Sequence, residues 1–151
     1  MDRNLKITTL ISTKHMWEWQ IKISERRQSA NSFFLSINTV IVGLVGYFQS
    51  SSNEKPPEFY LLISLAGMLI CYMWYRSVKS YKQINSGKFK VIHQIEQNLP
   101  IAPYDAEWEM LGRGEDPKKY LPFTHIEIFV PWVFFGLHVF VFGQGLFKLI
   151  R

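Results

Sequence analysis

The sequence predicts an all-α, polytopic membrane protein with three transmembrane helices and a helical cytoplasmic segment. Apolar residues make up 48% of the 151 residues and aromatic residues 16%, against only 19% charged residues. The apolar residues gather in segments 33–49, 59–75 and 128–147, and almost all charges fall outside them. This segregation is typical of membrane-spanning helices rather than of a globular core. The length leaves room for one domain, 1–151.

The segment before the first apolar run, 14–32, carries two competing patterns. Apolar and polar residues alternate over 17–24, which is typical of a strand, but several apolar residues also share one helical face. We favour a helix from about residue 14 to 48, because nothing in the following polar stretch favours a strand and no Pro precedes the first span. Residues 1–13 are expected to be poorly ordered.

Aromatic residues mark the predicted membrane boundaries or the packing of cytoplasmic segments. Trp17 and Trp19 either anchor at the lipid headgroups or pack against other cytoplasmic segments. The second is favoured, because a helix continuous with the span carries both side chains well beyond the bilayer. The full set comprises Trp17, Trp19, Trp74, Trp108 and Trp132.

The first span, 33–49, covers about 26 Å at 1.5 Å per residue, near the lower limit for crossing a bilayer. Small residues recur at three- and four-residue steps and form a stripe along one side: Ser32, Ser36, Thr39, Gly43, Gly46 and Ser50. In lipid such stripes let helix backbones approach closely. Packing within one protomer and packing between subunits or along a pore are both open, and we favour the second because three helices alone bury little.

The second span, 59–75, follows Pro56 and Pro57, which are tolerated where a helix begins. The single cysteine, Cys71, lies in this span, so no intramolecular disulfide can form. The first apolar run starts late and follows a charged segment, which indicates an uncleaved membrane signal rather than a signal peptide.

The segment 77–122 carries an apolar helical stripe up to about residue 99, with residues 85–87 as a potential break. Its charged residues up to Glu96 are interpreted as the solvated side of the helix. Pro100 and Pro103 end this helix, and a short helix over 105–111 with Trp108 on its apolar side is expected to follow.

The third span is predicted over 126–148. Thr124 and Glu127 form a capping-box pattern before it, and Pro131 is expected to kink or break the helix. His138 is an ionisable residue well inside this span, which makes it a functional candidate. A neutral His138 hydrogen-bonded to a neighbouring helix is the favoured interpretation.

The distribution of basic residues predicts the topology. Most of the 17 Lys and Arg residues precede the first span or lie between the second and third, while the loop 51–58 holds only Lys55. The N-terminus and 77–122 are therefore expected in the cytoplasm, and the C-terminus in the periplasm. The same pattern accounts for the net charge of +5, so no nucleic-acid partner is expected.

No motif for catalysis or cofactor binding is recognisable. His93 with Glu96, and His125 with Glu127, each supply two potential metal ligands without a third at a recognisable spacing. No phosphate-binding glycine loop or nucleophile motif is present. We therefore expect no enzyme, no cofactor and no metal site.

Three stretches resemble the RipA-like octameric membrane protein family (8xMP-type domain) of small bacterial inner-membrane proteins. They are SERRQSANSFFLSINT at the first span, NSGKFKVIHQIEQNLPIAPYDAEW between the second and third, and THIEIFVPW at the start of the third. The resemblance covers nearly the whole chain. It implies a homo-octamer in the bacterial inner membrane and carries no catalytic residues.

An octameric ring has a physical consequence. Eight helices about 10 Å apart give a ring radius of about 13 Å, and subtracting a helix half-width of about 5 Å leaves an opening too wide for side chains to close. It must hold water, lipid or another chain.

We expect a non-enzymatic assembly with a cytoplasmic helical platform. A regulated pore, a membrane-perturbing effector and a scaffold for a cytoplasmic protein partner are the alternatives.

Overall fold

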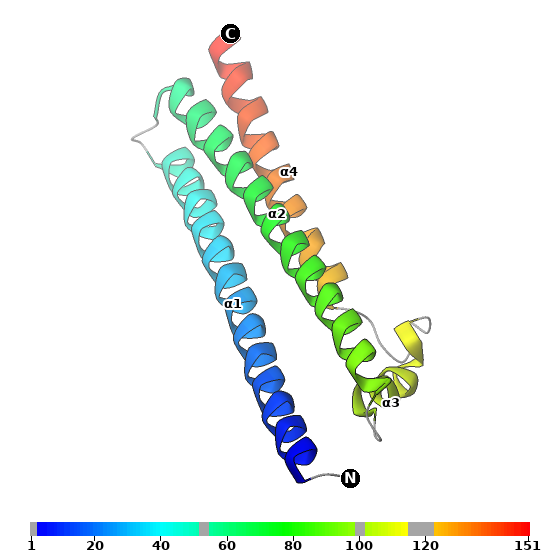
Figure 1. Ribbon diagram of the computed structural model, residues 1–151. Helices are drawn as coiled ribbons and strands as arrows, with labels where there is room; N and C mark the ends of the chain where they lie inside the picture. Colours follow the sequence, from blue (N-terminus) through cyan, green and yellow to red (C-terminus); the bar gives the residue numbers. More distant parts are fainter. Residues whose placement is uncertain (1–2, 52–54, 99–101, 115–122) are drawn as a thin grey trace.

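The computed structural model describes residues 3–51, 55–98, 102–114 and 123–151, and nearly all of these residues are helical (Figure 1). Its elements are α1 (Arg3–Ser50), α2 (Pro57–Glu96), α3 (Pro103–Met110), the 3₁₀ turn η1 (Gly112–Gly114) and α4 (Phe123–Ile150). The described residues contain no strand, so the all-α prediction is confirmed.

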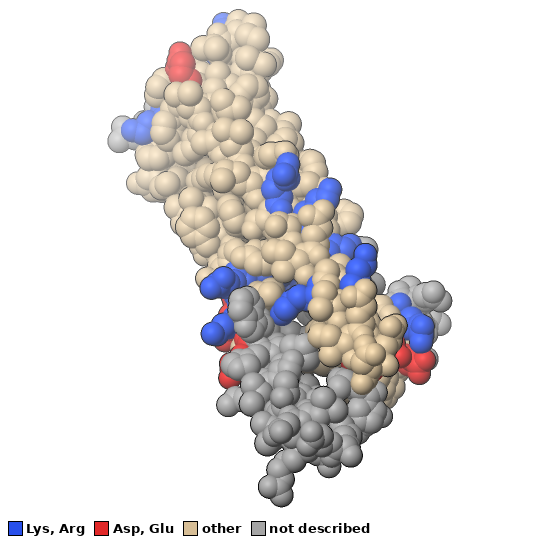
Figure 2. Space-filling model, in the orientation of Figure 1, with Lys and Arg blue, Asp and Glu red and all other residues tan. Residues whose placement is uncertain are grey.

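Three helices are long and apolar enough to cross a membrane: the Ile21–Ser50 part of α1, α2, and the Ile126–Ile150 part of α4. Most of the surface of each apolar window is exposed within the protomer. Figure 2 shows a broad region without charged residues, with Lys and Arg gathered beside it toward the α3 end of the molecule. This segregation is typical of a protein whose surface faces lipid.

α1 begins at Arg3, about eleven residues before the expected start near residue 14. Residues 3–13 belong to this helix, although the sequence pattern did not indicate one there. The strand alternative for 17–24 is not observed. The physical reason is that no Pro or Gly interrupts residues 3–42, so nothing stops a helix that is anchored by its membrane-spanning part.

α2 continues through residues 85–87 without the break that the sequence pattern suggested. A glycine inside a helix costs only about 1 kcal/mol relative to alanine, and here the helix is held on both sides of Gly87. The 40 residues of α2 form a rod of about 60 Å. It ends at Glu96, before the predicted prolines.

α3 starts at Pro103, two residues earlier than predicted, with the proline in its first turn. The chain then turns at Gly112 (φ 68°) and Arg113 (φ 52°), both in the left-handed region. Glycine adopts this region without strain, which explains why the helix ends here. The short helix therefore stops before this turn, at Met110.

α2 is the central helix of the protomer. It packs most extensively along α4 and less along α1, while α1 contacts α4 least. A small apolar core of Val45, Tyr60 and Val141 joins the three helices near the α1–α2 loop. Pro131 is fully buried inside α4, and the helix is assigned without interruption through it, so the expected break is absent.

The chain ends divide between the two ends of the bundle. The N-terminus and α3 lie at one end, and the α1–α2 loop and the C-terminus lie at the other (Figure 1). This is the arrangement that three successive spans produce.

Candidate functional site

The stripe of small residues on α1 is uncovered in the protomer. All six members are exposed: Ser32, Ser36, Thr39, Gly43, Gly46 and Ser50. A Cβ built on Gly43 or Gly46 would meet no atom within 4 Å. The sequence left open whether the stripe packs within one protomer or between subunits. In the described chain the stripe is exposed and does not pack closely against α2 or α4.

A second flank of α1, about 120° around the helix from the stripe, carries the series Asn31, Asn38 and Val45, spaced seven residues apart. Seven residues are nearly two helical turns, so all three face the same neighbours. Asn31 accepts a hydrogen bond from Trp74 Nε1 at 2.9 Å, and Val45 is buried in the apolar core. This inner flank attaches α1 to the other two helices.

Asn38 is the centre of a buried polar cluster that joins all three spans. Its side chain is 0% exposed. Its Nδ2 donates to Phe34 O at 2.8 Å, while its Oδ1 accepts from Cys71 Sγ at 3.2 Å and lies 3.0 Å from His138 Nε2. Cys71 and His138 were recognisable from the sequence, whereas Asn38 was not predicted, although its position seven residues after Asn31 was a signal.

His138 is 1% exposed, and its ring lies directly against the α2 backbone at Gly67. A Cβ at Gly67 would come within 2.5 Å of His138 Nδ1, so only glycine fits there. Since Asn38 Oδ1 can only accept, Nε2 of His138 donates to it. The neutral tautomer with its proton on Nε2 satisfies this bond, and the ring serves as a link between helices.

Among the residues that the structure describes, no three His, Cys, Asp or Glu side chains gather closely enough to hold a metal ion. The side chain of His125 lies outside the described residues, so its pairing with Glu127 is not addressed. His93 and Glu96 do lie together, with Nδ1 3.4 Å from Glu96 Oε2 and 3.9 Å from Asp105 Oδ1.

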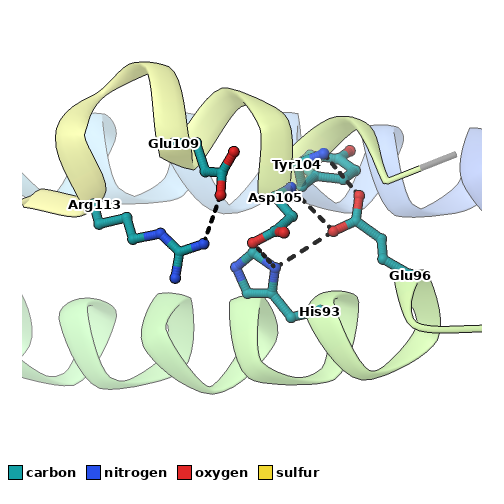
Figure 3. Close-up of polar contacts among 6 residues, drawn as sticks. All are labelled: His93, Glu96, Tyr104, Asp105, Glu109 and Arg113. Carbon is teal, nitrogen blue, oxygen red and sulfur yellow. Dashed lines mark hydrogen bonds and ion pairs between the residues drawn. The ribbon is translucent and has the colours of Figure 1, made fainter.

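Glu96 attaches the first turn of α3 to the end of α2 (Figure 3). Its Oε1 accepts from Tyr104 N at 2.7 Å and its Oε2 from Asp105 N at 3.2 Å. A carboxylate at a helix N-terminus satisfies N–H groups that have no partner inside the helix. Glu96 is 5% exposed, so its assignment to the solvated side of the helix was wrong.

The surroundings of Tyr104 at this contact are partly buried and acidic. Burial raises the pKa of Tyr104, and the nearby Glu107 and Glu96 raise it further. Tyr104 therefore stays neutral across the physiological pH range. Beyond it, Arg113 Nη2 pairs with Glu109 Oε1 at 2.8 Å on the solvent side (Figure 3).

The tryptophans that were expected at boundaries occupy different environments. Trp74 is 3% exposed and stacks on Phe34 with ring centroids 6.0 Å apart. Trp132 is half exposed and meets Tyr75 edge-on, and Trp108 is partly exposed on α3. The side chains of Trp17 and Trp19 lie outside the described residues.

Comparison with known proteins gives one match. The model of the octameric membrane protein family (8xMP) matches residues 11–147. No curated protein and no solved structure is found to match the chain.

Proposed function

The chain belongs to the octameric membrane protein family, and from this premise we propose that it is the protomer of a non-enzymatic homo-octamer in the bacterial inner membrane. The observation that carries the proposal is the uncovered stripe on α1. Its six members are exposed in the protomer and open space surrounds Gly43 and Gly46, whereas Asn31 and Asn38 on the inner flank of the same helix bond to α2 and α4.

The stripe suits contact between helices better than contact with lipid. Large apolar side chains such as Leu62, Leu69 and Met73 on α2 are 59–70% exposed and fit acyl chains. Between helices in a bilayer, association depends on close van der Waals contact, which small residues permit and large residues prevent. Gly43 and Gly46 therefore supply the position at which another backbone approaches.

The proposed topology places the N-terminus and α3 in the cytoplasm. The Lys and Arg residues gather toward that end (Figure 2), as positive-inside orientation requires. Repeated around a ring, the lower part of α2 with α3 forms the proposed cytoplasmic platform. Glu96 supports it by fastening α3 to the end of α2.

A regulated pore is the second candidate, and the exposed hydroxyl of Ser36 on the stripe favours it. A ring lined by this flank has a mildly polar surface, whereas a ring lined by the Phe- and Ile-bearing faces is dry or filled with lipid. Planar-bilayer recordings on the purified assembly test the pore. Silence at all voltages and pH values contradicts it.

A scaffold for a cytoplasmic partner has support in the exposed apolar side chains of α3, Trp108 and Met110. Crosslinking in cells tests this alternative. Recovery of contacts between copies of the chain alone contradicts it.

The experiment for the octamer compares two substitutions to leucine inside spans. Gly43→Leu fills the stripe, whereas Ala66→Leu adds a similar side chain to an exposed position on α2. Native mass spectrometry in mild detergent should find octamers for the wild type and for Ala66→Leu, and smaller species for Gly43→Leu. An unchanged octamer for Gly43→Leu contradicts the proposed interface.

A further inference from the structure

A pocket of about 470 Å³ lies between α1, α2 and α4, near the ends of the spans that face α3. Most of its lining comes from α1, including Ser24, Arg27 and Leu35, with Trp74 from α2 and Glu127 and Val130 from α4. Ser24 and Leu35 are eleven residues apart on one helix, so the pocket extends about 16 Å along α1. That distance covers the transition from lipid headgroups to acyl chains.

The lining of the pocket changes from charged to apolar along α1, as a bilayer changes from headgroups to acyl chains. The charged groups, Arg27 and Glu127, come from the polar lead-in of α1 and the first turns of α4. Toward the membrane interior, Leu35 and Val130 bring apolar surface. A pocket that is charged at one end and apolar at the other suits an amphiphile better than a soluble metabolite.

The two charges face each other without forming a direct hydrogen bond. Arg27 Nη1 lies 3.8 Å from Glu127 Oε2, and the two side chains are 32% and 20% exposed. Glu127 Oε2 is shielded from solvent, yet it accepts no hydrogen bond from the part of the chain that the structure describes. A shielded carboxylate oxygen without a donor is costly, so the pocket offers an anionic group that a ligand with N–H donors would stabilise.

A phospholipid with a primary ammonium headgroup satisfies both charges. A phosphate matches the guanidinium of Arg27, with which it forms charge-assisted hydrogen bonds. A primary ammonium matches the carboxylate of Glu127. Phosphatidylglycerol brings a phosphate without a cation for Glu127, a serine headgroup adds a second carboxylate beside Glu127, and a quaternary ammonium lipid has no N–H to donate.

We propose that this pocket binds a zwitterionic phospholipid with a primary ammonium headgroup, its phosphate at Arg27 and its ammonium at Glu127. The acyl chain next to the headgroup follows the groove between α1 and α4 over Leu35 and Val130. These two helices make the weakest contact in the bundle, so the lipid fills the least packed junction of the protomer. The proposal requires that the three helices cross the bilayer, but it does not require a particular number of subunits.

The test measures which lipids remain bound after purification. The full-length protein is reconstituted in vesicles with equal parts of phosphatidylethanolamine, phosphatidylglycerol and phosphatidylcholine, and extracted in mild detergent. The co-purifying lipids are then quantified by mass spectrometry. Two charge-assisted contacts predict an enrichment of phosphatidylethanolamine over the bulk mixture of about tenfold. Equal retention of the three lipids, preference for either of the other two, or protein free of phospholipid overturns the proposal.

Two variants separate the contributions of the two charges. Glu127→Gln keeps the shape of the side chain but removes the anion, so the preference should shift from phosphatidylethanolamine toward phosphatidylglycerol. Arg27→Gln should abolish the enrichment of all phospholipids. The matched control is Arg26→Gln, which removes a neighbouring cation that does not line the pocket and should leave the enrichment unchanged. If Arg26→Gln lowers the enrichment as much as Arg27→Gln does, then general surface charge and not this pocket attracts the lipid, and the proposed site is overturned. Because the wild-type measurement needs no variant, poor folding of either one leaves the proposal testable.

Discussion

The two flanks of α1 show how one helix can carry two packing surfaces of opposite kinds. The inner flank presents Asn31, Asn38 and Val45 to α2 and α4, and each has a partner in the protomer. The outer flank presents exposed serines, a threonine and glycines, with open space around Gly43 and Gly46. Both flanks hold small or polar residues, so composition alone does not separate them. They differ in their contacts: the inner flank packs against α2 and α4, and the outer flank is exposed and can contact another copy.

The same contrast exists between glycines. At Gly67 a Cβ would collide with the ring of His138, and at Gly145 it would lie 3.2 Å from Leu61 Cδ2. At Gly43 and Gly46 the space is open. Substitution by alanine therefore distinguishes glycines that the protomer requires from glycines that only an assembly can require.

The largest effect is expected for Gly67→Ala. The added methyl group must displace the His138 ring, which breaks its bond to Asn38 and opens the α2–α4 contact. Overpacking costs about 1–3 kcal/mol, and the lost hydrogen bond adds about 1 kcal/mol. Unfolding in mixed detergent micelles with increasing dodecyl sulfate measures the loss.

The double variant Gly67→Ala with His138→Ala is the control for Gly67→Ala. Removing the ring should recover part of the stability, so the two losses should add to more than the double variant shows. Strictly additive losses would mean that the ring does not occupy the space next to Gly67.

A smaller loss, about 1–2 kcal/mol, is expected for Asn38→Leu, which leaves the hydrogen-bond donors of Cys71 and His138 without their acceptor. Hydrogen bonds between membrane helices contribute about 0.6 kcal/mol each on average and up to about 1.7 kcal/mol. The same unfolding titration measures the effect. Ser36→Ala on the outer flank is the matched control and should change little; an equal loss at the two positions would remove the distinction between the flanks.

The Gln49–Gln144 contact joins α1 to α4 near the loop end, with 3.1 Å between Nε2 and Oε1. Both groups are open to the surroundings, so Gln144→Leu should cost less than about 0.5 kcal/mol. Thermal unfolding followed by circular dichroism provides the measurement. A loss as large as that of Asn38→Leu would show that α1 depends on its loop end more than on its buried centre.

The smallest effect on the protomer is expected for Gly43→Ala. No atom lies near the new methyl group, and alanine favours a helix over glycine by up to about 1 kcal/mol, so the protomer should be unchanged or slightly stabilised. Unfolding in a detergent that dissociates the assembly measures the stability of the protomer alone. A clear destabilisation would place Gly43 among the glycines that the protomer requires.

Much of the fold follows from the sequence, because the signals involved are local. Runs of apolar residues indicate the spans, and the prolines after residue 99 indicate that the long helix stops and that a separate short helix follows. The extent of α1 was underestimated, because helix propensity in residues 3–13 is weak and an adjoining anchored helix supports it. The continuity of α2 past Gly87 has the same origin.

The candidate sites were harder to predict, because their residues meet only through the tertiary register. Asn38, Cys71 and His138 lie 33 and 67 residues apart in the chain, and no spacing rule joins them. Glu96 was interpreted as solvated because periodicity cannot show that α3 folds back over it. The pocket at Arg27 and Glu127 likewise needs the relative placement of two helices. The stripe on α1 was recognisable because all its members belong to one helix.

The 48 residues of α1 form one unbroken helix, about 72 Å in length, without a proline or glycine before Gly43. Sharp bends in helices need such residues or a local disruption of the backbone ladder. A displacement at the first turns of α1 is therefore transmitted along a continuous helix, with no proline or glycine hinge before Gly43 to absorb it. The cytoplasmic end of α1 and the stripe inside the bilayer are mechanically coupled through one backbone.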